Sequence, residues 1–403
     1  MTRTLLSNAR IFDGTGPDIS EGDVVLENGR ISDVGTGLDG DESFDLGGKA
    51  LLPGLFDCHT HVAVSNVDLF AIVQKPFSLH FYEAANNLKA TLDAGITTIR
   101  DAGGADLGMK RAVETGLISG PHMQVSLVML SQTGGHGDGW LASGQHLRLF
   151  TQHPGLPSNI VDGPDEIRRK VREVVRMGAD VIKVATSGGV LSPRDDPRHA
   201  HFTLEELQVL VETARALGVW VMAHAQAYDG IKNAVRADIR SIDHGIYLDD
   251  EAIELMLAHG TFLVPTLVAP TGVVKAAEAG MSIPEASLQK AKDVIEIHRG
   301  SFARAVAAGV KVAMGTDSGV TPHGDNLDEL ELMEQGGMAP EDVLLATTRN
   351  GAELMGLLDD RGTIEPGKRA DLVVLDGNPL EMKGLRSRIQ AVFKDGRLAS
   401  GSV

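Results

Sequence analysis

Both ends of the chain carry short apolar runs that alternate with polar positions and are separated by turns. These runs are Leu5–Ile11, Asp23–Leu26, Ile31–Val34, Ala370–Leu375 and Ile389–Phe393. Asn28-Gly29, between two of the runs, is a strong hairpin signal, because both residue types tolerate the backbone twist of a tight turn. A lone hairpin is only marginally stable. We therefore expect residues 1–54 and 365–403 to pair into one small β-sandwich domain.

The middle of the chain has a different pattern, in which short β-branched runs alternate with longer helical ones. The predicted strands are Leu55–His61, Ile96–Asp101, Met123–Val128, Val181–Ala185, Val219–His224, Ser241–His244, Phe262–Thr266 and Val312–Thr316. Among the predicted helices, Pro164–Met177 opens with Pro-Asp-Glu, and Leu204–Leu217 follows a capping box of Thr203 and Glu206. Eight βα units of this total length fit a (β/α)8 TIM barrel better than an open sheet. We expect this barrel to span residues 55–364.

Two long irregular stretches interrupt the predicted barrel. Residues 131–163 form the longer one, and a second lies around 265–284, after the seventh predicted strand. Loops of this length inside a compact domain are usually functional and often close over a site. We interpret both stretches as candidate lids.

Composition narrows the class of protein. The 403 residues are 42% hydrophobic and 23% charged, which is typical of a globular protein, and the net charge is −18. Binding to nucleic acid or to an anionic membrane needs an excess of Lys and Arg, so neither partner is expected. Cys58 is the single cysteine, which rules out an intrachain disulfide, and no run has the length of a signal peptide or a membrane span. We expect a cytoplasmic protein that acts on a small molecule.

Polar residues stand at the ends of the predicted barrel strands, where TIM barrels carry their chemistry. They are His59, His61, Asp101, Lys183, His224, His244 and Asp317. His59 and His61 share one face of a strand, because side chains alternate with a period of two. Alone, the pair has two interpretations: two ligands of one ion, or ordinary hydrogen-bonded histidines. Several polar side chains in an apolar barrel are costly unless they meet a common partner, which favours a metal site.

Lys183 and Asp317 each have a functional and a structural interpretation. Burial of Lys183 in an apolar strand would lower its pKa and leave a neutral amine, which reacts with carbon dioxide to form a carbamate that can bridge two cations. The alternative is a lysine that reaches solvent or pairs with an anion. Asp317 can bind a metal and exchange a proton with bound water, or it can cap the next helix. His224 and His244 can likewise be core histidines.

A resemblance to a known family is carried by stretches spread over nearly the whole chain. They are Pro53-Gly-Leu-Phe-Asp-Cys-His59-Thr-His61, the sequences around Lys183, His224 and His244, Gly315-Thr-Asp317, and the segment from Gly362 to Val374. Together they resemble the amidohydrolase superfamily of metal-dependent hydrolases. Within it, the segments Thr133-Gly-Gly-His136-Gly-Asp and Ile182–Gly189, with Tyr228 after His224, are similar to Xaa-Pro dipeptidases (prolidases) and related carboxypeptidases.

The resemblance implies roles for individual residues. One divalent ion would be held by His59, His61, Lys183 and Asp317, and a second by Lys183, His224 and His244. It implies that Lys183 is N6-carboxylated and that a bridging hydroxide attacks the substrate. We expect the ions to be zinc, since histidine-rich sites suit it, although manganese or cobalt could occupy the same ligands. The resemblance further implies that His136 polarises the scissile carbonyl, that Tyr228 helps to hold the substrate carboxylate, and that His323 lines the site. From the residues alone, His136 can instead brace its glycine-rich loop and Tyr228 can begin a helix.

The function that these roles imply is hydrolysis of an amide bond in a dipeptide or N-acyl amino acid with a free C-terminal carboxylate. Asp317 would act as general base and then as general acid. Deaminases of the superfamily typically lack the bridging lysine, so Lys183 argues against deamination. Two alternatives stay open: hydrolysis of a cyclic amide of the imidazolone kind, and a catalytically inactive scaffold of the same fold. We expect a homo-oligomer, of a size that the sequence does not specify.

Overall fold

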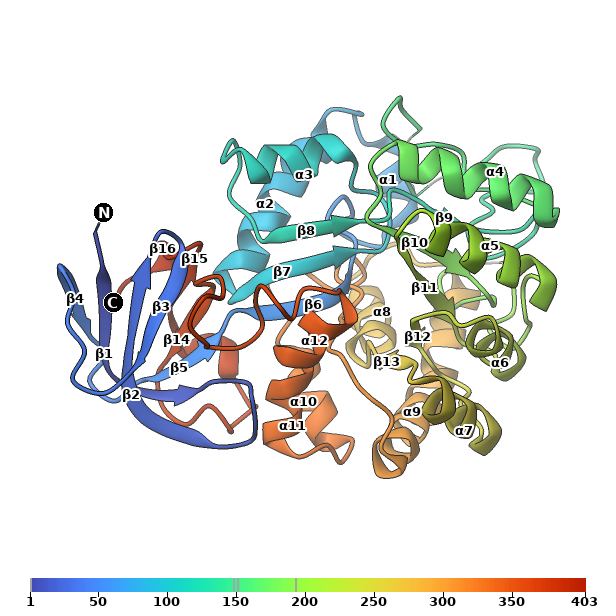
Figure 1. The fold of residues 1–403 in the computed structure, drawn as a ribbon. Coiled ribbons are helices and arrows are strands. Elements are labelled where there is room, and N and C mark those ends of the chain that lie inside the picture. The colour runs from blue at the N-terminus through green and yellow to red at the C-terminus, as the bar shows by residue number, and fades with distance from the viewer. Residues whose placement is uncertain (1, 148, 151, 193) are drawn as a thin grey trace.

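The two ends of the chain build a β-sheet domain beside a barrel (Figure 1). The computed structural model describes residues 2–147, 149–150, 152–192 and 194–403. Within them, no helix combines the length and the apolar character that crossing a membrane requires. The N- and C-termini both lie in the sheet domain, as expected from the similar patterns of the two ends.

Strands from both ends pair in one hydrogen-bonded sheet. They are β1 (Thr4–Phe12), β2 (Ile19–Glu27), β3 (Arg30–Gly35), β4 (Glu42–Asp45), β5 (Ala50–Pro53), β14 (Leu372–Leu375), β15 (Ile389–Lys394) and β16 (Arg397–Gly401). Their order is β16-β15-β14-β5-β1-β2-β3, with β4 paired to β1. The ends meet where β14 runs antiparallel to β5, with Leu372 opposite Pro53. The strands curl around an apolar core of their own, which includes Leu6, Leu26 and Phe393.

The predicted hairpin turn is confirmed between β2 and β3. Asn28 and Gly29 have φ values of 53° and 77°, the left-handed conformation that a two-residue turn needs at both positions. Asp395 and Gly396 repeat this geometry between β15 and β16. The hairpin at Asn28-Gly29 was predictable from the sequence because its turn depends on local backbone preferences.

Parallel strands build the barrel in two hydrogen-bonded groups. They are β6 (Leu55–Thr60), β7 (Ile96–Asp101), β8 (His122–Val125), β9 (Met129–Leu130), β10 (Val181–Ala185), β11 (Trp220–Ala225), β12 (Ser241–His244) and β13 (Phe262–Val264). The groups are β6-β7-β8 and β13-β12-β11-β10-β9. Residues 311–318 close the circle between β13 and β6, with single bridges from Leu263 to Val312 and from Thr60 to Ser318.

The structure corrects two predicted strands. The third ends at Val125, because Leu127 takes a φ of 66° that breaks the extended chain before β9. The eighth, Val312–Thr316, forms no regular ladder and is held by individual contacts, such as the donation from the Cys58 amide to the Met314 carbonyl over 2.8 Å. Both segments keep the positions expected of barrel strands.

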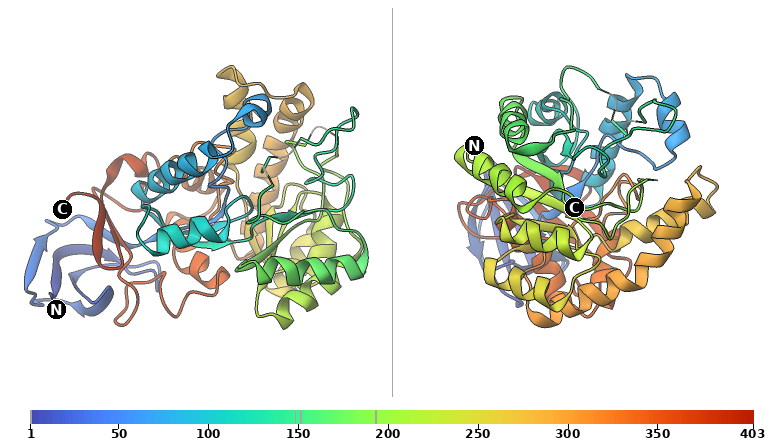
Figure 2. Two further views of the ribbon diagram at one scale, coloured as in Figure 1. Left: turned by 90° about the horizontal axis from the view of Figure 1, so that it is seen from above. Right: turned by 90° about the vertical axis from the view of Figure 1, so that its right-hand side faces the viewer.

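Helices surround the barrel strands, as the view from the end opposite the sheet shows (Figure 2). They are α1 (Leu69–Gln74), α2 (Leu79–Asp93), α3 (Leu107–Glu114), α4 (Gly163–Arg176), α5 (Leu204–Ala216), α6 (Tyr228–Arg236), α7 (Asp250–His259), α8 (Val268–Glu278), α9 (Glu285–Ala308), α10 (Asp328–Gln335), α11 (Pro340–Ala346) and α12 (Arg349–Leu354). A 3-10 helix, η1 (Leu385–Arg388), precedes β15. The predicted capping box is present at α5, where Thr203 and Glu206 bond each other's backbone amides.

Of the two predicted irregular stretches, the first is confirmed and the second is wrong in part. The described residues between β9 and α4 contain no helix and no ladder of strands. Residues 265–284 instead include the helix α8, in which Pro270 occupies the first turn and is therefore tolerated. The buried Glu329 accepts hydrogen bonds of 2.8 Å from the amides of Leu267 and Val268, which lie 62 and 61 residues earlier in the chain. These bonds satisfy amides at the start of the helix.

Candidate metal centre

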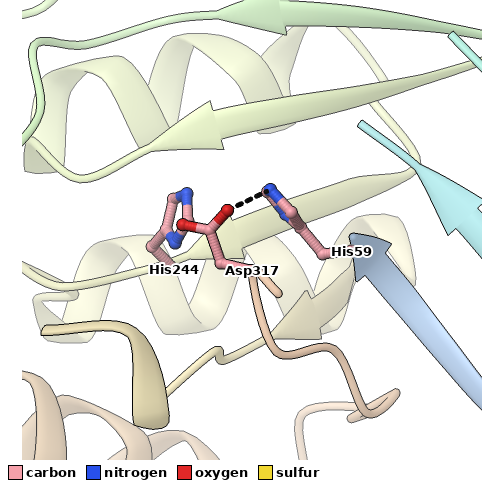
Figure 3. A group of neighbouring side chains, drawn as sticks. All are labelled: His59, His244 and Asp317. Carbon is pink, nitrogen blue, oxygen red and sulfur yellow. Dashed lines mark ion pairs between the residues drawn. The ribbon is translucent and has the colours of Figure 1, made fainter. Parts of the chain in front are cut away.

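The six predicted ligands converge on one cavity of about 240 Å³ at the C-terminal ends of the barrel strands. They are His59, His61, Lys183, His224, His244 and Asp317. Parallel strands bring these positions together because their carboxyl ends all open on the same side of the barrel. Figure 3 shows His59, His244 and Asp317 pointing toward one another from β6, β12 and the segment that closes the barrel. Each of these three side chains offers a ligand atom within 4.8 Å of the other two.

Asp317 is the meeting point of the two histidines of the first strand. Its Oδ1 lies 3.2 Å from His61 Nε2 and 3.4 Å from His59 Nε2. Burial alone would raise the pKa of Asp317, but the two histidines hold it well below the usual value. This arrangement of two imidazoles on one carboxylate oxygen is compatible with a shared divalent cation.

His224 and His244 are buried imidazoles that have no carboxylate at hydrogen-bond distance among the described residues. His224 Nε2 lies 3.1 Å from the Gly188 carbonyl, and His244 Nδ1 lies 2.7 Å from Thr266 Oγ1. Burial and neighbouring positive groups lower the pKa of both well below the usual value. They are therefore neutral at pH 7, which is the form in which histidine binds a metal.

Strained backbone occurs at consecutive strand ends around this cavity. His244, Thr266 and Asp317 have φ values of 74°, 53° and 59°, in the left-handed region that non-glycine residues rarely occupy. Such conformations persist where the surrounding structure imposes them, and they cluster at functional sites. Here the strain aims two of the predicted ligands into the cavity.

Asp243 is a component of the site that sequence reasoning missed. Its Oδ2 lies 2.8 Å from Lys183 Nζ and 3.0 Å from His59 Nδ1, and its Oδ1 lies 3.3 Å from the Arg100 guanidinium. Burial alone would raise the pKa of Asp243, but Lys183 and Arg100 hold it well below the usual range. The available signal was a carboxylate inside a predicted barrel strand, where an ionised group is costly without partners. Those partners come from β6, β7 and β10.

Asp101, at the end of β7, supports loops instead of joining the ligand cluster. Its carboxylate accepts hydrogen bonds of 2.9 to 3.1 Å from the backbone amides of Val62, Gly103 and Ala105. The carbonyl of Gly103 lies 2.9 Å from His61 Nδ1. Asp101 thus orients the loop that fixes the ring of His61.

His136 reaches the cavity from the long loop after β9, as predicted. Its ring stacks on that of His224, with centroids 4.2 Å apart and planes 17° apart. Its Nδ1 lies 2.8 Å from Ser192 Oγ and 3.0 Å from Asp195 Oδ2. Neither Ser192 nor Asp195 was singled out in the sequence, because nothing in their local pattern points to His136.

The structure does not bring Tyr228 or His323 into the cavity wall. Tyr228 is the first residue of α6, is 46% exposed and has the Lys232 ammonium 5.6 Å from its ring centroid. His323 places Nε2 2.8 Å from the Val64 carbonyl and so braces the segment after β6. Neither residue is among the described residues that line the cavity. The sequence left open whether Tyr228 begins a helix, and the structure supports that interpretation.

The rest of the cavity wall is mostly apolar. Its apolar residues are Val64, Val67, Leu69, Val128, Met129, Leu147, Leu149, Phe150, Leu156, Pro157, Val190, Leu191, Ile246, Ala269, Pro270, Val273 and Val320. Several belong to the long loop after β9, and others to α8, so both stretches that were predicted as lids contribute to the wall. A cavity with a polar floor and apolar walls is suited to a small organic substrate.

Comparisons with known proteins agree with this geometry. A crystal structure of a Xaa-Pro dipeptidase with bound methionine is 32% identical, with a TM-score of 0.90 over 99% of this chain and all of its own. A prolidase complexed with N-methylphosphonate-L-proline is 35% identical, with a TM-score of 0.91 over the whole of both chains. Ochratoxinase of Aspergillus niger is 32% identical over 99% of this chain and 87% of its own length.

The family model described as "Amidohydrolase family" matches residues 50–401, which include every ligand position described above. The family resemblance read from the sequence is therefore confirmed, and with it the class of reaction. The chain belongs to the amidohydrolase family and is a metal-dependent hydrolase of carbon–nitrogen bonds.

Proposed function

We propose that the protein hydrolyses the amide bond of a dipeptide or N-acyl amino acid that has a free C-terminal carboxylate. The observation that carries the proposal is the convergence of six ligand-type side chains on one apolar-walled cavity, with His136 in its wall. The similarity to a Xaa-Pro dipeptidase, a prolidase and an ochratoxinase supports this substrate class.

The donor set fits divalent metal ions. His59, His61 and Asp317 supply two imidazoles and a carboxylate at one point, while His224 and His244 are neutral and adjacent, with ring centroids 4.6 Å apart. We assign one ion to His59, His61, Lys183 and Asp317, and the other to Lys183, His224 and His244. Histidine-rich sites suit zinc, so zinc is the metal we propose.

Lys183 would serve both ions as an N6-carboxylated side chain. Burial lowers its pKa, although Asp243 opposes the shift. Its Nζ lies 2.8 Å from Asp243 Oδ2, so carbamate formation requires the ammonium to lose a proton and leave that carboxylate. Asp243 would then keep Arg100 and His59 as partners.

The protein's own groups account for positioning and proton transfer. When bound, the two ions would supply Lewis acidity for the amide carbonyl and lower the pKa of water. Asp317, whose low pKa keeps it ionised, is placed to accept a proton from the attacking water and pass it to the leaving nitrogen. His136 would contact the scissile carbonyl from the wall of the cavity, and the apolar wall would receive apolar side chains of the substrate.

The test combines metal analysis with a substrate screen. Purified protein should contain zinc, lose activity on chelation, and hydrolyse at least one member of a panel of Xaa-Pro, Xaa-Arg, Xaa-Phe and N-acyl amino acid substrates. Asp317→Asn should lower turnover by about 10² to 10⁴-fold, whereas Asp250→Asn, an exposed position on α7, should leave it unchanged. Full turnover in Asp317→Asn or Lys183→Ala, or activity on a cyclic amide alone, would contradict the proposal.

A further inference from the structure

The ring of His136 is held at one face and at Nδ1, although it belongs to a loop without regular structure. One face stacks on His224, and the edge lies so close to Gly189 that a Cβ added there would come within 2.2 Å of its Cε1. Ser192 Oγ and Asp195 Oδ2 both lie within 3.0 Å of Nδ1. The Asp195 side chain is 3% exposed, so these contacts are shielded from water.

The hydrogen bonds around Asp195 identify the proton on the His136 ring. Ser192 donates its hydroxyl proton to Asp195 Oδ1, and the Gly189 amide donates to Oδ2 over 3.0 Å. Burial alone would raise the pKa of Asp195, but its bonds to His136 and Ser192 hold it at about 2. An ionised carboxylate only accepts, and Ser192 has no second proton to give. Nδ1 of His136 is therefore the donor.

Nε2 is consequently the ring atom that His136 has available for a ligand. Within the described residues Nε2 makes no hydrogen bond, while the side chain lines the cavity. When both ring nitrogens carry a proton, Nε2 donates to an acceptor in the cavity while Nδ1–H stays on Asp195. An oxygen with developing negative charge is the matching acceptor.

Lys290 of α9 ties this loop to the body of the barrel. Its ammonium lies 2.6, 2.7 and 3.0 Å from the carbonyl oxygens of Asp195, Ser192 and Gly189. All three residues also lie against the His136 ring. Lys290 Nζ is also 3.4 Å from Asp195 Oδ1, so it stabilises the ionised carboxylate as well as the loop.

We propose that Asp195 is a positioning residue that, with Ser192 and anchored by Lys290, fixes His136 with Nδ1 protonated and Nε2 directed at the scissile carbonyl of the substrate. This inference deepens the proposed function and rests on it for the identity of the acceptor. Groups that orient a directly acting residue typically change activity by about 10- to 100-fold when they are removed.

The kinetic test is a double-mutant cycle with matched controls. Asp195→Asn should lower kcat by about 10- to 100-fold with little change in KM and in metal content. Because Asp195 acts through His136, His136→Ala and His136→Ala/Asp195→Asn should have the same kcat. A double variant slower than His136→Ala by the full single-variant factor would show a merely structural role and overturn the inference.

Each test variant has a control at a nearby residue of the same type that does not contact His136. Asp196→Asn alters the next carboxylate, which pairs with Arg198 over 2.6 Å, and should leave kcat within about twofold of the unmodified protein. Lys290→Met should reproduce part of the Asp195→Asn loss, whereas Lys292→Met, at an exposed position of α9, should not. Equal losses in Asp195→Asn and Asp196→Asn would also overturn the inference.

A measurement without substrate separates this inference from the proposed function. In protein with ¹⁵N-labelled histidine, NMR should show a slowly exchanging, downfield Nδ1 proton of His136 that persists in Asp196→Asn and disappears in Asp195→Asn and His136→Ala. Absence of that proton in the unmodified protein would overturn the inference. Its presence in a protein that hydrolyses no dipeptide or N-acyl amino acid would leave the positioning intact and contradict the proposed function alone.

Discussion

Asp243 Oδ2 lies 2.8 Å from Lys183 Nζ, although the two residues stand on β12 and β10 with β11 between them and neither side chain is more than 1% exposed. Asp243 also contacts Arg100 and His59, so one carboxylate contacts side chains from three other strands. The buried side chains of Asp243, Lys183, Arg100 and His59 therefore form one network that links four barrel strands.

Removing Asp243 should destabilise the protein strongly. Asp243→Ala would leave Lys183 and Arg100 buried without their counter-charge, and breaking a buried pair in this way costs about 3 to 5 kcal/mol. Urea unfolding of protein treated with a metal chelator measures this loss of free energy of unfolding. Asp250→Ala, at an exposed position on α7, should cost less than about 1 kcal/mol. Equal stabilities of the two variants would mean that the network contributes nothing.

Substitution of Tyr228 should leave catalysis nearly unchanged. Its side chain is 46% exposed and lies outside the cavity wall, so Tyr228→Phe removes only a hydroxyl at the surface. We expect kcat and KM within about twofold of the unmodified protein, as for most surface substitutions. A KM increase of about tenfold or more with unchanged kcat would instead support the carboxylate contact that the family resemblance implied.

His201 should make stability depend on pH below neutrality. Burial lowers its pKa to about 4, against an ordinary value of 6.5, so the folded state favours the neutral ring. The stability that this provides is present above pH 6.5 and is lost as pH falls toward 4.

The measurement for His201 compares unfolding at pH 7 and pH 4.5. When the pH falls from 7 to 4.5, the free energy of unfolding of His201→Gln should decrease by about 2 to 3 kcal/mol less than that of the unmodified protein. The reason is that one pKa unit corresponds to about 1.4 kcal/mol. His146→Gln, at an exposed position, should follow the unmodified protein. The same pH dependence in all three proteins would rule out a contribution of His201.

Filling the cavity should select against large substrates. Val320 is a partly buried residue of the cavity wall, and Val320→Phe would reduce the room for an apolar side chain. We expect kcat/KM for a dipeptide with a large apolar side chain to fall about tenfold relative to a glycine-containing dipeptide, with unchanged metal content. Val34→Phe, on an exposed position of the sheet, serves as the control. Parallel losses on both substrates would contradict a role of this wall in selectivity.

Local signals in the sequence accounted for much of the fold. The turn at Asn28-Gly29 and the capping box at Thr203 depend on residues within four positions of one another, so they were predictable. The third barrel strand was misjudged because Leu127 takes a left-handed φ of 66° that no local signal marks. The helix α8 was missed because its start is supported by Glu329, which is distant in the chain. Propensity is a weak guide where tertiary contacts decide the backbone.

For the site, too, some features were readable from the sequence and others only from the structure. The sequence by itself determined the types and order of the candidate ligands, since His59, His61, Lys183 and Asp317 stand at predicted strand ends whose position follows from periodicity. Only the tertiary structure decided which partners they meet. Asp195 and Asp243 became visible through contacts with His136 and Lys183, which stand 59 and 60 positions away in the chain. Tyr228 was placed outside the cavity wall. Such contacts form when the barrel closes, and no local pattern encodes them.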